Sequence, residues 1–301
     1  MPPRGPSPVC DDPNRDLVGG IGGGVRMIRI CVAGATGWAG RAVVEEILRS
    51  ADLQLTGAVA RTGVGADLGS VLGTNPVGVR VAATVDAALN AAVGVDVLVD
   101  YTSHLLVRED TLAAIRRGVA VVIGSSGLTR TDFDEIDALA REHRVGVIAA
   151  GNFSITAAMA QAAAVLVARH LPNVEIIDFA AAEKPDAPSG TARELAERLA
   201  AEIRPSEGAA PSDAGPTEAP SSLPARGTSV DGIHIHSVRL PSFSVSTEAV
   251  FGLADERLTI RHDAGRSADP YVRGTLLAVR MVTRRIGLTR GLDALLQEDT
   301  A

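Results

Sequence analysis

The segment from Glu183 to Ala192 combines a possible proton donor with a possible anion-binding turn. Lys184 supplies an ammonium group, and Pro188 ends any preceding helix because it lacks a backbone N–H and disfavours a helical residue before it. The letters T-A-R-E at 191–194 form a capping-box pattern, which predicts that a helix begins there. Such a helix start would leave three backbone N–H groups free to hold an anion. These groups belong to Ser189, Gly190 and Thr191.

On its own, this string also fits an ordinary capped helix behind a surface lysine. The functional interpretation is that the ammonium and the turn together attract a carboxylate-bearing substrate. This interpretation requires a cofactor-binding site elsewhere in the chain, and three other segments are candidates for it.

A glycine-rich loop follows the short apolar run from Ile28 to Ala33, and a helix with apolar residues at 43, 44, 47 and 48 follows the loop. The spacing is G-x-x-G-x-x-G, not the usual G-x-G-x-x-G of dinucleotide-binding proteins. Its place between strand and helix still allows close approach of the backbone to a pyrophosphate. The residues expected to bind cofactor here are Gly34, Ala35, Thr36, Gly37, Trp38, Ala39 and Gly40.

The next predicted strand, Leu53 to Ala60, ends beside Arg61. An acidic residue at this place would bind the ribose 2′-hydroxyl of NAD, whereas an arginine can pair with the 2′-phosphate of NADPH. Arg61 therefore favours NADPH, with NADH possible. The alternative is a solvated arginine at the end of a strand.

Later predicted strands end at 99, 123 and 149, each followed by a loop of small residues. Open α/β sheets bind ligands at the carboxyl ends of their strands, and glycine or small hydroxyl residues let a flat nicotinamide ring approach the backbone. His104, in the first of these loops, is a tempting general base, but a lone loop histidine is more often solvated or a helix cap. The loop residues that we place at the cofactor are Thr102, Gly124, Ser125, Ser126 and Gly127.

Composition restricts the class of protein. The 301 residues are enough for two domains, and 46% hydrophobic residues with only 3% aromatic ones favour a tightly packed α/β fold. The net charge of −7 argues against nucleic acid and acidic membrane surfaces as partners. The apolar run from Ile155 to Leu171 is interrupted by Gln161 and Arg169, so it predicts a buried helix and not a membrane span. We expect a cytoplasmic protein.

Two domains follow from the order of the predicted elements. Residues 1–26 have the composition of a disordered tail. Residues 27–151 and 270–301 form a parallel-sheet dinucleotide-binding domain, and residues 152–269 form an α+β domain with a mixed sheet. In that sheet Ile233 and Ile235 alternate with His234 and His236, which we place on its outer face. No third ligand has suitable spacing, so no metal site is predicted.

Several motifs together resemble the 4-hydroxy-tetrahydrodipicolinate reductase (dihydrodipicolinate reductase) family of lysine and diaminopimelate biosynthesis. The resemblance runs from about Met27 to the last helix and keeps the family's order. The motifs are VAGATGWAG, DYTSH, GSSGLT, GNFSI, KPDAPSGTA, GIHIHSVRLP and LTIRH.

This resemblance implies a Rossmann-like nucleotide domain and an inserted sheet domain that binds substrate and builds a homotetramer. It implies that Asn152 and Phe153 border the nicotinamide together with the 124–127 loop. It also implies that Lys184 binds substrate or donates a proton, and that Ser189, Gly190 and Thr191 bind the carboxylate-bearing substrate.

One departure from the family pattern bears on the substrate. The family carries a histidine pair just upstream of the lysine, in a pattern like H-H-x-x-K, whereas this chain has Ala180 and Ala181 there and Glu183 directly before the lysine. A later family histidine is replaced by Ser246. Methyl groups enlarge the pocket and remove hydrogen-bond donors, so the site should discriminate against the family's substrate.

Three functions follow from these observations. The first is a paralogue that uses NAD(P)H to reduce a C=N or conjugated C=C bond in another small, cyclic, carboxylate-bearing substrate, with Lys184 as anchor or acid. The second is the ordinary lysine-pathway reductase working without its histidines. The third is a nucleotide-binding protein without catalysis, which retention of Lys184 and the DAPSGTA string argues against.

Overall fold

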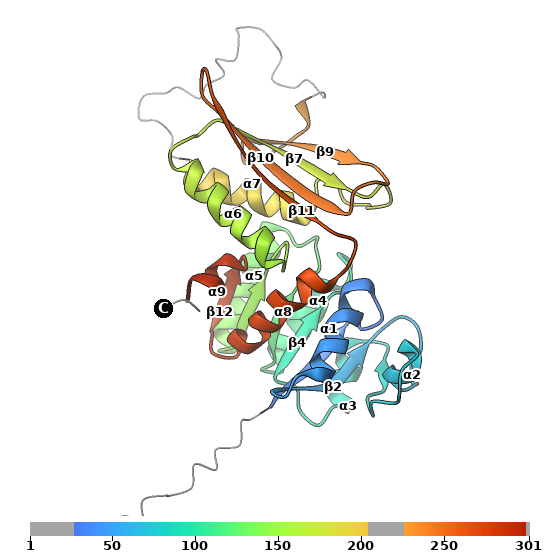
Figure 1. The fold of residues 1–301 in the computed structure, drawn as a ribbon. Coiled ribbons are helices and arrows are strands. Elements are labelled where there is room, and N and C mark those ends of the chain that lie inside the picture. The colour runs from blue at the N-terminus through green and yellow to red at the C-terminus, as the bar shows by residue number, and fades with distance from the viewer. Residues whose placement is uncertain (1–26, 204–225, 299–301) are drawn as a thin grey trace, which may run out of the picture.

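The computed structural model describes residues 27–203 and 226–298 as two domains, each built on one sheet (Figure 1). The tail predicted for residues 1–26 lies outside the described residues. The first sheet is parallel and has the order β12-β6-β5-β4-β1-β2-β3. Its strands are β1 (Ile28–Ala33), β2 (Leu53–Val59), β3 (Val81–Ala82), β4 (Val97–Asp100), β5 (Ala120–Ile123), β6 (Gly146–Ala149) and β12 (Gly287–Arg290).

Helices cover both faces of this sheet, as its near-continuous apolar strands require. Along β1, Ile30 and Val32 enter one core while Cys31 and Ala33 enter the other. The first core is closed by α1 (Trp38–Arg49), α2 (Leu68–Leu72), α8 (Asp269–Val282) and α9 (Asp293–Glu298). The second is closed by α3 (Val85–Ala91), α4 (Val107–Arg116) and α5 (Arg130–Glu142). The chain's C-terminal part thus returns to the first domain.

The second sheet is mixed, with the order β11-β10-β7-β9-β8 and a parallel pairing only between β7 and β9 among its described strands. Its core side, which includes Ile233 and Ile235, packs against two helices, while His234 and His236 point to the other side. The elements are α6 (Ile155–Ala168), β7 (Val174–Ala180), α7 (Gly190–Glu202), β8 (Thr228–Val230), β9 (Ile233–Arg239), β10 (Val245–Gly252) and β11 (Arg257–Ala264). The α/β fold class predicted from sequence is confirmed.

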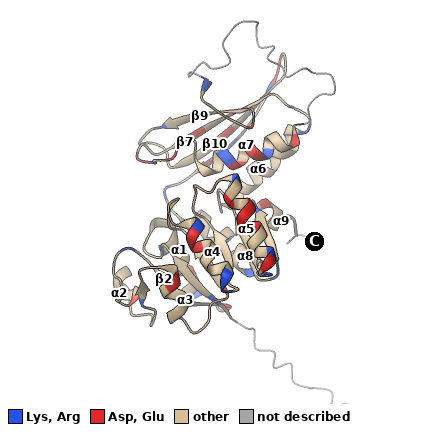
Figure 2. Ribbon diagram, turned by 180° about the vertical axis from the view of Figure 1, so that it is seen from behind, with Lys and Arg blue, Asp and Glu red and all other residues tan. Residues whose placement is uncertain are grey.

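Helix α6 is less buried than the buried helix that we predicted from this apolar run. Its alanines at 157, 158, 164 and 168 are buried, with Ala158 in the core closed by α8 and Ala164 and Ala168 in the core of the second domain. Met159 and Leu166, two turns apart on one side of the helix, are exposed. Within the described residues, no helix has the length and apolar content needed to cross a membrane. Helix α7 lies between the second sheet and the first domain, and both signs of charge occur along it (Figure 2).

Candidate active site

The loop of residues 34–40 joins β1 to α1 through close backbone contacts that only glycine permits. Gly34 has φ +83°, and a Cβ added there would lie 2.2 Å from the Tyr101 carbonyl oxygen. A Cβ added at Gly40 would lie 2.1 Å from the Gly34 oxygen. Gly37 is the N-cap of α1 and offers no side-chain cap. The N-terminal N–H groups of this helix are therefore left for an anion, which fits a dinucleotide pyrophosphate.

Trp38 links this loop to the segment that returns from the second domain. Its indole Nε1 donates to the Arg266 carbonyl oxygen at 3.2 Å, and its ring meets Tyr271 edge-on with 5.4 Å between centroids. The side chain is 57% exposed. The indole therefore lies at the domain junction, where a ligand between the domains would reach it.

Asp100, which the sequence analysis did not select, organises the loops after β4 and β5. Its buried Oδ1 accepts hydrogen bonds from the Thr102 N–H at 3.0 Å, the Thr102 hydroxyl at 2.8 Å and the Ser125 hydroxyl at 2.6 Å. Burial raises the pKa of Asp100, and the bonds from Ser125 and Thr102 oppose that shift. Two residues predicted to touch cofactor are thus positioned by one carboxyl group.

A second carboxyl group near Asp100 makes stability depend on pH. Burial, and then the charge of Asp100, raise the pKa of Asp110 from 3.8 to about 7. The folded protein therefore retains a proton that the unfolded chain releases, so the free energy of unfolding falls as pH rises from about 4 to about 7 and is level above that. Asp110 is only half-buried, so solvent screening reduces the effect. We expect the Asp110→Asn variant to lose less stability than the wild type between pH 5 and pH 8, by on the order of 1–2 kcal/mol. Urea unfolding at both pH values measures this, and equal losses would contradict it.

The nicotinamide loop predicted at 124–127 and the turn before α7 touch one another. A Cβ added at Gly190 would lie 3.2 Å from the Ser126 Cβ. Both residues line a cavity of about 510 Å³ between the domains, and Gly151, Asp186 and His104 line it too. The structure therefore brings two predicted sites together, while the 34–40 loop after β1 and Arg61 after β2 lie two and three strands away from β5 along the same sheet edge.

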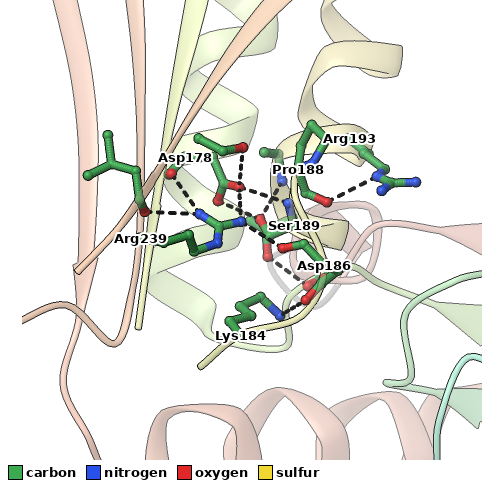
Figure 3. Close-up of polar contacts among 12 residues, drawn as sticks. Asp178, Lys184, Asp186, Pro188, Ser189, Arg193 and Arg239 are labelled. Atoms are coloured by element: carbon green, nitrogen blue, oxygen red, sulfur yellow. Dashed lines mark hydrogen bonds and ion pairs between the residues drawn. The ribbon is translucent and has the colours of Figure 1, made fainter. Parts of the chain in front are cut away.

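The turn before α7 is held by a buried carboxylate on β7 (Figure 3). Asp178, which is fully buried, accepts from the Ser189 N–H at 2.8 Å and from the Ser189 hydroxyl at 2.7 Å. It also accepts from Arg239 at 2.8 Å, and Arg239 in turn donates to the Asp186 carbonyl oxygen at 2.7 Å. The prediction of a free N–H at Ser189 is therefore wrong, because Asp178 already occupies it.

The predicted helix start is also corrected. Ser189, not Thr191, is the N-cap of α7, and its hydroxyl oxygen accepts from the Ala192 N–H. Thr191 and Glu194 do not form a capping box. Instead, the Thr191 hydroxyl donates to the Gly151 carbonyl oxygen at 2.8 Å, and the Gly151 N–H donates to the Glu194 carboxylate. The two side chains of the T-x-x-E pattern therefore form hydrogen bonds across the junction between the domains.

Lys184 lies at the edge of this arrangement. Its ammonium is 2.7 Å from Asp186 Oδ1, while Asp186 Oδ2 is buried and has no hydrogen-bond partner among the described residues. Lys184 is also the only lysine among the 29 Lys and Arg residues of the sequence. Arginine therefore supplies every other fixed positive side chain, and lysine appears only at this turn.

Comparisons with known proteins cover both domains. Family models described as "Dihydrodipicolinate reductase, N-terminus" and "Dihydrodipicolinate reductase, C-terminus" match residues 28–153 and 152–296. The chain belongs to the dihydrodipicolinate reductase family. It is therefore an NAD(P)H-dependent oxidoreductase, and the non-catalytic alternative loses its support.

Individual members of the dihydrodipicolinate reductase family align over nearly their whole length. A 4-hydroxy-tetrahydrodipicolinate reductase of Desulfitobacterium hafniense (strain DSM 10664 / DCB-2) is 37% identical over 91% of this chain and 100% of its own. One of Moorella thermoacetica is 36% identical over 91% and 99%. The structure of a dipicolinate-bound dihydrodipicolinate reductase from Paenisporosarcina sp. TG-14 matches with a TM-score of 0.66 and 32% identity, covering 89% of this chain and 99% of that one.

The places where we expected the family's histidine pair lie at the end of β7. Ala180 is fully buried between Arg239 of β9 and Val245 of β10, and Ala181 is half-buried after it. Ser246 is buried on β10. The imidazole that does line the cavity belongs to His104, which the sequence analysis set aside.

Proposed function

We propose that this member of the dihydrodipicolinate reductase family reduces a C=N or conjugated C=C bond in a small, cyclic, carboxylate-bearing compound. The contact between Ser126 and Gly190 carries the proposal, because it joins the loop expected at the nicotinamide to the turn expected at the substrate. A bound reduced nicotinamide supplies the hydride. The protein holds the acceptor bond beside it and excludes water between the domains.

In this proposal Lys184 donates the proton that completes the reduction. A guanidinium would anchor a carboxylate at least as well as an ammonium, but it stays protonated at neutral pH and cannot act as an acid. Arginine supplies every other basic side chain except the histidines, so positive charge alone does not explain a lysine at this position. The property that lysine adds is the ability to donate a proton. Asp186 holds the ammonium at 2.7 Å, beside the cavity that Asp186 lines.

The substrate is proposed to differ from that of the named relatives. Ala180 and Ala181 offer no hydrogen-bond donor from their side chains, and a site that lacks such donors loses affinity for the groups they would bind. The second candidate is 4-hydroxy-tetrahydrodipicolinate itself, which is favoured by the names of relatives that are 36–37% identical over nearly full length. His104 would then supply the imidazole in the cavity.

We also propose a cytoplasmic homotetramer assembled through the second sheet. The side of that sheet opposite α6 and α7 is not covered by any described helix, and its apolar side chains are only half-buried. They include Ile177, Phe179, Val238 and Val250. A partly apolar sheet face of this kind is typical of a surface that packs against another copy.

NADPH is the proposed cofactor, and its preference is expected to depend on Arg61. The residue is exposed at the end of β2, where no acidic side chain follows the strand. The Arg61→Ala variant should bind NADPH more weakly by on the order of 1.5–3 kcal/mol, because the 2′-phosphate loses its cationic partner. NADH has no 2′-phosphate, so its binding should change little. Calorimetric titration with each cofactor measures this. Equal losses for both would show that Arg61 is structural.

Deuteride transfer tests the reaction itself. The protein is incubated with NADPH deuterated at the transferred position and, in separate reactions, with 4-hydroxy-tetrahydrodipicolinate and with five- and six-membered cyclic imino acids. The proposal expects one deuterium on the carbon of the reduced bond in at least one product. Absence of label and of NADPH oxidation with every compound would contradict it.

A further inference from the structure

Helix α7 is fastened to the nucleotide domain by a clasp consisting of Thr191, Glu194 and the peptide groups of Gly151. The Thr191 hydroxyl holds the Gly151 carbonyl oxygen, and the Glu194 carboxylate holds the Gly151 N–H. Residues three apart share one face of a helix, so both bonds come from the same side of α7. The adjacent side, with Ala192, Ala196 and Leu199, packs in the core of the second domain.

Further along the helix, two ion pairs continue the attachment. Arg198 donates to Asp293 of α9 at 2.8 Å, and Glu197 pairs with Arg290 of β12 at 2.8 Å. Both partners belong to the nucleotide domain. Helix α7 is therefore bound along one polar face to that domain, although in the chain it belongs to the other one.

The clasp sets the distance between the two halves of the site. A Cβ added at Gly151 would lie 2.8 Å from the Gly190 carbonyl oxygen, and one added at Gly190 would lie 3.2 Å from the Ser126 Cβ. Gly190 is thus packed closely between Gly151 and the nicotinamide loop. Any shift of α7 along this line changes the separation of the two halves directly.

Stability of the fold does not explain why a glutamate is buried at position 194. It is 5% exposed, its Oε1 has no hydrogen-bond partner among the described residues, and the nearest cation, on Arg198, is 3.9 Å away. Burial raises the pKa of this carboxyl group. A buried carboxylate with one oxygen that accepts no hydrogen bond costs free energy of folding, so its presence needs another reason.

We propose that Thr191 and Glu194 are positioning residues, which hold the first turn of α7 against the 124–127 loop for the reduction. The proposal rests on the proposed function of that turn and loop. Glu194 acts through Gly151 and does not need to touch the substrate, whereas Thr191 also belongs to the turn that is expected to bind it. Their hydrogen bonds to Gly151 keep the turn before α7 fixed relative to the nucleotide domain. The acceptor bond of a substrate held at this turn therefore stays aligned with the nicotinamide.

Hydrogen exchange in the NADPH-loaded protein tests the mechanical part without a substrate. The variants are Glu194→Ala, which removes the acceptor, Glu194→Gln, which keeps one, and Glu202→Ala as a control at the far end of α7, where Glu202 pairs with Arg169. We expect at least tenfold faster exchange of Gly151, the first turn of α7 and the 124–127 loop in Glu194→Ala only. Unchanged exchange in that variant, or equal acceleration in the control, would overturn the proposal whether or not a substrate is known.

Turnover tests the consequence, on the panel compound that the wild type reduces fastest. Misplacement on the order of 1 Å can cost about 100-fold in rate. We expect Glu194→Ala to lower kcat at least tenfold, with an NADPH Kd within about twofold of the wild type and an unfolding midpoint that does not fall. Glu194→Gln should restore kcat to within about threefold. Wild-type kcat in the alanine variant, or a glutamine variant as slow as the alanine one, would contradict a positioning role.

Discussion

Replacing Lys184 with alanine is expected to lower kcat/KM for the reduction at least 100-fold, with the NADPH Kd within about twofold of the wild type. A general acid contributes typically 10²–10⁴-fold, which corresponds to roughly 3–5 kcal/mol of transition-state stabilisation. Nucleotide affinity should be nearly unchanged because Lys184 lies in the second domain, after β7. Steady-state kinetics and calorimetry measure the two quantities separately.

The Lys184→Arg variant distinguishes an acid from an anchor. Arginine keeps the positive charge beside Asp186, so KM should stay within a few-fold of the wild type, but kcat should fall almost as far as in the alanine variant. If the arginine variant keeps wild-type kcat, Lys184 is only a carboxylate anchor. If the alanine variant keeps more than about a tenth of kcat/KM, a loss under ~1.4 kcal/mol, Lys184 is not the key group.

The largest effect on stability is expected at Asp178. The Asp178→Ala variant should lose about 3–5 kcal/mol of free energy of unfolding, because it leaves the mostly buried guanidinium of Arg239 and the N–H of Ser189 without their acceptor. The loss should also misplace the turn before α7, since Ser189 and Asp186 are both held through this network. Denaturant unfolding measures it.

Asp263 provides a matched control. It makes a two-pronged ion pair with Arg261 on β11 of the same sheet, but both side chains are exposed. The Asp263→Ala variant should therefore lose less than about 1 kcal/mol. Comparable losses in the two variants would show that burial of the Asp178 pair does not govern its contribution.

The parts of the fold that repeat a pattern were predictable from sequence. Apolar strands, the glycine loop between β1 and α1, and small-residue loops after β4 and β5 follow from periodicity and from backbone geometry that glycine alone allows. The short strand β12 (Gly287–Arg290), which pairs with β6, was missed because Leu288 is its only large apolar residue. Strands β4, β5 and β6 are equally short, but each is an apolar run that the sequence shows.

The carboxylates that organise the site were not predictable in the same way. Asp100 and Asp178 each interrupt or end an apolar strand, a signal for a buried acid, but their partners lie up to 61 residues away along the chain. Glu194 had a plausible local partner in a capping box, and a tertiary contact with Gly151 displaced it. Local hydrogen-bond patterns cannot show which of two competing N–H donors will bind a carboxylate in the folded chain.

The substrate is the central question, and a side-by-side assay answers it most directly. The NADPH-dependent kcat/KM for 4-hydroxy-tetrahydrodipicolinate is measured for this protein and for the Desulfitobacterium hafniense relative under the same conditions, and again with cyclic imino acids. With Ala180 and Ala181 in place of donors, we expect a value at least 100-fold below that of the relative, and a higher value for another cyclic carboxylate. A value within tenfold of the relative's, with no better substrate in the panel, would contradict the altered-substrate proposal and favour 4-hydroxy-tetrahydrodipicolinate.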